Sequence, residues 1–150
     1  MKLKRTIDRR RGGLALLLTA VLVLAGACSA PKEDGETTGA GIFLDGNPWT
    51  AGSPLPEGKG DLTVYVTLDG ETLMTLPFEE PHVVRIVLPD GGENTLTLTG
   101  TAVTMTEANC EGQDCVRMGE ITRENLEVRV MGGFIICLPH RVSVEVRSRD

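Results

Sequence analysis

The sequence predicts an all-β domain, a small sandwich or barrel of about six to eight short antiparallel strands, behind a signal peptide and a disordered tether. From residue 61 onward, apolar and polar residues alternate in short runs that are separated by glycine-containing turns. No stretch shows a convincing period of 3.6 residues, so no long helix is predicted. The composition agrees, because 18 glycines and 8 prolines favour many turns.

Residues 1–27 have the organisation of a secretory signal. A basic start is followed by the apolar run Leu14–Ala25, which is short for a transmembrane helix, and by small residues up to Cys28. This ending resembles the lipobox of bacterial lipoproteins, although Ala25 stands where a large aliphatic residue is usual. The resemblance implies acylation of Cys28 and an extracytoplasmic protein anchored to the cell membrane. The alternative is an uncleaved N-terminal anchor that happens to contain a cysteine.

Residues 28–41 are small, polar and charged, so they predict a flexible tether that cannot bury apolar surface. The whole chain has a formal net charge of −6 and residues 1–27 are net basic, so the remainder is strongly acidic. An acidic domain repels phosphate backbones, and we expect no nucleic-acid partner. It also repels an anionic membrane surface, so we expect the lipid to supply the membrane attachment.

Residues 42–60 are rich in proline and glycine and are expected to form an irregular arm or loop over the domain. The only tryptophan, Trp49, lies in this segment. We expect it to fill an edge of the core, because buried aromatic rings supply much of the apolar area of a small domain. The alternative is an exposed binding platform.

Residues 61–150 are predicted to form the β domain. Asp69-Gly70 stands between two alternating runs and indicates a hairpin, and the glycine pairs 91–92 and 132–133 indicate further turns. The predicted strands are residues 62–68, 72–76, 82–88, 95–99, 102–106, 126–130, 134–136 and 142–146.

Three cysteines lie in the second half of this domain, and several interpretations remain open. Cys110 and Cys115 are close enough in sequence to form a disulfide in an oxidising compartment, although so small a loop would add little stability. With Cys137 and His140 they could also provide the Cys₃His set that zinc favours. The third interpretation is a set of buried thiols that act as small apolar residues.

A reactive thiol is a further possibility. The carboxylates of Glu107, Glu111 and Asp114 surround Cys110 and Cys115 in sequence, and negative charge opposes the thiolate, which is the reactive form. The same charges are mildly favourable to a bound cation.

Two segments carry a family resemblance: EANCEGQDCVRMGEI at residues 107–121 and ICLPHRVSVEV at residues 136–146. They resemble the family built on domain II of the transcription factor NusG, whose members include free-standing exported or membrane-attached proteins. The resemblance covers residues 61–148 and implies an all-β fold, but it implies no activity. Residues 122–133 depart from the shorter members, and here we expect an inserted strand before Phe134.

These features predict a membrane-anchored lipoprotein that carries a non-catalytic binding or accessory module of the cell envelope, with a possible envelope protein as partner. No serine stands in a nucleophile-elbow setting, so we expect no enzyme and no cofactor. The alternative is a thiol-redox or metal-binding accessory protein that uses Cys110, Cys115 and Cys137, with zinc as the metal and His140 as a further candidate ligand.

Overall fold

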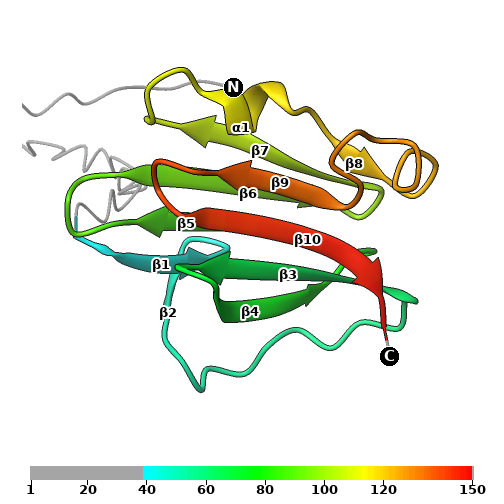
Figure 1. Ribbon diagram of the computed structural model, residues 1–150. Coiled ribbons are helices and arrows are strands. Elements are labelled where there is room, and N and C mark those ends of the chain that lie inside the picture. The colour runs from blue at the N-terminus through cyan, green and yellow to red at the C-terminus, as the bar shows by residue number, and fades with distance from the viewer. Residues whose placement is uncertain (1–38, 150) are drawn as a thin grey trace, which may run out of the picture. The chain divides into compact units, whose positions relative to one another are not determined.

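The computed structural model describes residues 39–149 and folds them into two antiparallel sheets (Figure 1). The strand orders are β2-β1-β5-β6-β7-β8 in the six-stranded sheet and β4-β3-β10-β9 in the four-stranded sheet. A short helix, α1 (Asp114–Arg117), follows β7. The strands are β1 (Gly41–Leu44), β2 (Asn47–Trp49), β3 (Leu62–Leu68), β4 (Glu71–Pro77), β5 (Pro81–Val87), β6 (Glu93–Thr99), β7 (Ala102–Ala108), β8 (Ile121–Thr122), β9 (Phe134–Cys137) and β10 (Val142–Ser148). The predicted all-β, sandwich-like fold is confirmed.

The alternating runs form strands because one face of each run is apolar and can be buried. Apolar side chains from both sheets meet in one core, and Val64, Val84 and Val144 are fully buried in it. The predicted hairpin at Asp69-Gly70 joins β3 to β4, and both residues have positive φ, at 53° and 86°. Such a two-residue loop matches the twist of the paired strands.

The first part of the stretch predicted as an irregular arm, residues 42–60, is a β-hairpin instead. β1 and β2 pair with each other, and β1 also pairs with β5. Asp45 and Gly46 have φ values of 51° and 79°, so this Asp-Gly pair forms the same kind of turn as the one at residues 69–70. Trp49, at the end of β2, is only 9% exposed and belongs to the core, as expected.

The strand expected at residues 126–130 does not form, and this segment is a series of turns. The Asn125 side chain accepts a hydrogen bond from the Thr122 N–H and donates one to the Glu120 carbonyl, while the Asn125 carbonyl accepts from the Val128 N–H. These local bonds replace a strand ladder. Val128 and Val130 are 81% and 102% exposed, so their alternation with polar residues does not reflect a buried face.

Residues 39–149 contain no helix with the length and apolar character needed to cross a membrane. The predicted signal peptide, Cys28 and most of the tether predicted for residues 28–41 lie outside the described residues.

Candidate functional site

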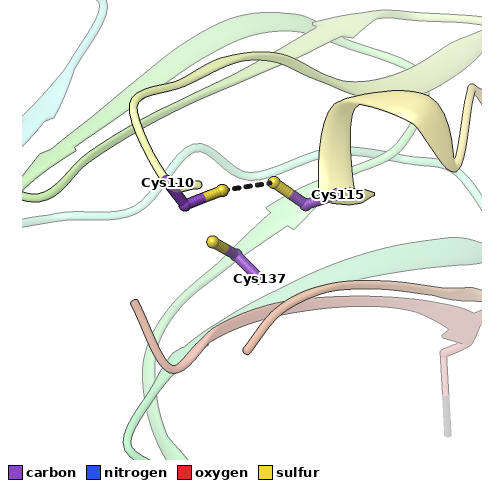
Figure 2. Close-up of side chains that lie close together, drawn as sticks. All are labelled: Cys110, Cys115 and Cys137. Carbon is purple, nitrogen blue, oxygen red and sulfur yellow. Dashed lines mark hydrogen bonds between the residues drawn. The ribbon is translucent and has the colours of Figure 1, made fainter. Parts of the chain in front are cut away.

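The three cysteines of the domain come from three separate elements. Cys110 lies in the turn after β7, Cys115 lies in α1 and Cys137 is the last residue of β9. Since β7 and β9 belong to different sheets, the cysteines join the two layers of the domain. Figure 2 shows their side chains pointing toward one another from these three segments.

Polar side chains shape the turn that carries Cys110. Gln113 has a left-handed backbone with φ of 52°, and its side-chain amide donates to the Ala108 carbonyl over 2.8 Å. The Asn109 side chain accepts a hydrogen bond from the Glu93 N–H over 2.7 Å. These bonds satisfy backbone groups where β7 ends and reverse the chain, so that Cys115 returns to face Cys110.

The sulfur atoms form a compact buried group. The Sγ atoms of Cys110 and Cys115 are 3.8 Å apart, and the Sγ atoms of all three cysteines lie within 4.8 Å of one another. All three residues are buried, and Cys115 and Cys137 are each only 1% exposed. The convergence of Cys110, Cys115 and Cys137 is a property of the folded chain, because residue 137 is far from the other two in sequence.

The hypothesised disulfide between Cys110 and Cys115 is not formed in this structure. All three cysteines are free thiols. The separation of 3.8 Å between the two sulfurs is well beyond the roughly 2.05 Å of an S–S bond. The pair does lie side by side, as the short sequence spacing suggested, so whether it oxidises stays a prediction.

Burial first, and then hydrogen bonds and charge interactions with Cys137 and Cys110, together raise the pKa of the Cys115 thiol to about 12. The Cys115 thiol therefore keeps its proton at neutral pH and is a poor nucleophile. The sequence suggested acidic neighbours as the reason for a raised thiol pKa. In the structure the main cause is removal from water.

A cavity of about 60 Å³ lies over the sulfurs, and its wall includes Glu111, Asp114 and Leu138 besides the three cysteines. It is large enough for a water molecule or a metal ion. The carboxylate of Glu111 gives this part of the surface a negative character, whereas the carboxylate of Asp114 is ion-paired with the Arg117 guanidinium. The arrangement can hold a cation against the thiols, and it admits small reagents more readily than large ones.

His140 is not part of the cysteine group, although the sequence made it a candidate ligand. Among the described residues, the group of potential metal ligands with this spacing contains the three cysteines and no histidine. His140 is buried and its Nδ1 donates instead to Oδ1 of Asn94 over 2.7 Å. The Cys₃His set is therefore not assembled.

Asn94 connects His140 to Cys115 and was not among the residues predicted for the site. It lies on β6 and is 1% exposed. Its Nδ2 faces two sulfur atoms, Sδ of Met105 at 3.5 Å and Sγ of Cys115 at 4.0 Å. The sequence did contain a signal for it. Asn94 falls on the same face of β6 as Leu96 and Leu98, so the alternation predicts a polar side chain in the core at this position.

Comparison with known proteins places this domain in a family. A search of curated proteins finds no match. Among solved structures, the Lin0431 protein from Listeria innocua is 22% identical with a TM-score of 0.51, covering 61% of this chain and 100% of its own. A DUF1312 family protein (EF3258) from Enterococcus faecalis is 22% identical with a TM-score of 0.52, covering 59% of this chain and 99% of its own. Both share the fold.

A DUF1312 family protein from Ruminococcus gnavus is 32% identical and covers 58% of this chain and 99% of its own, with a TM-score of 0.46. The family model for NusG domain II matches residues 15–150. This match spans nearly the whole chain and includes both segments that carried the resemblance in the sequence. The chain belongs to the NusG domain II family.

Proposed function

We propose that this chain is a membrane-anchored lipoprotein whose NusG domain II-like module is a non-catalytic binding or accessory domain of the cell envelope. The signal-like residues 1–27 and the lipobox-like ending at Cys28 support export and anchoring. A lipoprotein-type cysteine carries more than one acyl chain, which stable anchoring requires. Family membership supports a small domain without catalysis of its own.

A groove beside β9 is the observation that carries the binding role. It has a volume of about 400 Å³ and is lined mainly by the β9–β10 hairpin, with Phe134, Ile136 and Leu138 among its apolar residues. Leu138 is 79% exposed and directly follows Cys137. Arg141 and Asp69 form an ion pair of 2.9 Å at the rim. Apolar residues surrounded by charged ones are typical of a protein-binding surface.

Replacement of the anchoring cysteine tests the first part of this proposal. In cells that make the Cys28→Ser variant, we expect the precursor to stay unprocessed by the lipoprotein signal peptidase, with no acylation. The inhibitor globomycin should have the same effect on the wild-type chain. Cys137→Ser is the matched control and should be processed normally. Unchanged processing and acylation of Cys28→Ser would contradict the lipoprotein assignment.

Site-specific crosslinking in intact cells tests the binding surface. A photo-crosslinking residue at position 138 should yield one discrete product with an envelope protein, and Phe134→Asp should suppress it. The matched control is a crosslinker at position 128, which is about as exposed (81% against 79%) but lies outside the groove. Equal products from both positions, or none from position 138, would argue against the groove as the binding surface.

The convergence of three sulfur atoms favours a second candidate function, a thiol-redox or metal-binding accessory protein. The reduced Cys28→Ser chain should then either bind a metal ion or lose two thiols to oxidised glutathione, with a mass decrease of about 2 Da for one disulfide. Alkylation followed by mass spectrometry measures both the thiol count and the mass. A chain that keeps three alkylatable thiols and binds no metal would contradict this candidate.

A further inference from the structure

The spacing of the three sulfurs is that of ligands around one metal ion. With Zn–S bonds of about 2.3 Å, neighbouring sulfurs of a tetrahedral site lie about 3.8 Å apart. Cys110 and Cys115 have this separation of 3.8 Å, and Cys137 completes a group within 4.8 Å. We propose, building on the thiol site given above as the second candidate function, that these three cysteines bind one soft d¹⁰ metal ion, Zn²⁺ or Cu⁺, with Asn94 and His140 as positioning residues.

The direction of the Asn94 amide supports a ligand role for Cys115. A buried amide is costly unless its hydrogen-bonding groups are satisfied, and a sulfur atom of a neutral thiol or thioether is a weak acceptor. Nδ2 of Asn94 nevertheless faces the sulfurs of Met105 and Cys115. A thiolate bound to a metal is a stronger acceptor than a thiol, so ion binding turns a weak contact into a charge-assisted hydrogen bond.

His140 holds the Asn94 amide in place through a hydrogen bond to Oδ1. Its Nδ1 donates to Oδ1 of Asn94 over 2.7 Å, and this leaves Nδ2 on the side of the sulfur. The reversed amide would direct an oxygen at a negatively charged sulfur. Such hydrogen bonds behind a metal ligand hold it in place and adjust its affinity for the ion.

Binding is an exchange of protons for the ion. Each S–H bond breaks as a metal–sulfur bond forms, and about three protons pass to solvent for each ion bound. No oxidant or reductant is needed. The cavity of about 60 Å³ then adjoins the ion. Zn²⁺ can take a water molecule there as its fourth ligand, whereas Cu⁺ is satisfied by three thiolates.

The negative surface around the site favours a cation. Glu111 and Asp114 line the cavity beside the cysteines, and because Asp114 is ion-paired with Arg117, Glu111 supplies the unbalanced negative charge. Opposite charge at the entrance raises the local concentration of a cation and lowers that of anionic oxidants or anionic thiol reagents. The same negative charge makes it less favourable for a cysteine without a bound metal to lose its proton. It therefore favours a bound ion over a free reactive thiolate.

Titration of the full chain with each ion tests the site. The Cys28→Ser chain, reduced and metal-free in detergent, is titrated with Zn²⁺ in one arm and anaerobically with Cu⁺ in the other, each against a chromophoric chelator. We expect one ion per chain and about three protons released in at least one arm. Cys137→Ser should abolish this binding, whereas Val128→Ser, at an exposed position that does not line the cavity, should leave it unchanged.

Two variants test the positioning residues. Asn94→Leu and His140→Leu should each weaken binding roughly 10- to 100-fold while the stoichiometry stays at one ion. With Co²⁺ as a spectroscopic substitute for Zn²⁺, Asn94→Leu should also shift the sulfur-to-cobalt charge-transfer band, which a purely structural role would not alter. Unchanged affinity and unchanged spectra in both variants would overturn their role.

The same preparation separates failure of the metal site from failure of the thiol function. If neither ion is retained but oxidised glutathione produces a Cys110–Cys115 disulfide, the metal proposal is wrong and the thiol function stands. If neither ion binds and the three thiols resist oxidation, both are wrong. Binding that persists in Cys137→Ser would overturn the three-sulfur site.

Discussion

Nδ1 of His140 donates to Oδ1 of Asn94 over 2.7 Å, and this hydrogen bond links the two sheets of the domain inside its core. His140 lies in the connection between β9 and β10, whereas Asn94 lies on β6. Both residues are buried. A polar pair at this depth is tolerated because each partner satisfies the other, and losing one partner costs more than the bond itself contributes.

Replacement of His140 tests the energetic importance of this pair. His140→Ala should lower the free energy of unfolding of the reduced, metal-free protein by about 1–3 kcal/mol, because Oδ1 of Asn94 is left buried without a donor. Urea denaturation measures the change. In the double variant with Asn94→Leu the orphaned carbonyl is gone, so the combined loss should be smaller than the sum of the single losses. Strict additivity would show that the two side chains are not coupled.

The raised pKa of Cys115 predicts a loss of stability in alkaline solution. Its pKa is about 12 in the folded chain against an ordinary value of 9.0 for a cysteine, so the folded state holds this proton more tightly than the unfolded state. The resulting stability is fully present below about pH 9 and is lost as the pH rises toward about 12. Urea denaturation of the reduced, metal-free protein at increasing pH should show this decline.

The Cys115→Ala variant is the control for this loss of stability at high pH. The variant lacks the titrating thiol, so its stability should fall less steeply above about pH 9 than that of the parent chain. Equal slopes for the two proteins would mean that other groups cause the decline.

Two adjacent glycines should respond very differently to alanine. A Cβ at Gly133 would lie 2.2 Å from the carbonyl oxygen of Val146, whereas a Cβ at Gly132 would meet nothing within 4 Å. Gly133→Ala therefore forces the backbone away from β10 and should cost more than about 2 kcal/mol. Gly132→Ala, where φ is 56°, should cost about 1 kcal/mol from backbone strain alone. Thermal unfolding of both variants measures the difference.

The decisive result is whether Gly133→Ala loses more stability than Gly132→Ala. The turn segment before β9 packs closely on β10 at Gly133, whose carbonyl accepts from the Val146 N–H over 2.8 Å. If Gly133→Ala is tolerated as well as Gly132→Ala, this close packing is not required for the fold.

Trp49→Ala tests whether the first hairpin is part of the cooperative domain. Removal of this buried ring should lower the free energy of unfolding by about 3 kcal/mol, through lost burial and the cavity left behind. Far-UV circular dichroism during denaturation reports the loss. Pro48→Ala, at an exposed position of the same strand, should change stability by less than about 0.5 kcal/mol. Equal effects would mean that the hairpin is only loosely attached.

Much of the fold could be read from the sequence because the alternation of apolar and polar residues is a local signal. The runs that became β3, β5, β6 and β10 each bury one face, and Asp69-Gly70 identified its turn. Asp45-Gly46 is an Asp-Gly pair of the same kind, but the prolines that follow it favoured the prediction of an irregular loop. The run at residues 126–130 had the alternation of a strand without a partner to pair with, and local hydrogen bonds from Asn125 decided its conformation.

Local sequence patterns were enough to predict the family, the all-β class and the cysteines that could form a site. The convergence of Cys137 with Cys110 and Cys115, and the contact of His140 with Asn94 instead of the sulfurs, became visible only in the folded domain. Alternation determines which face of a strand is buried, because that depends on neighbours one or two residues away. It does not determine which residues of two different sheets meet across the core, because that depends on how the sheets pack together.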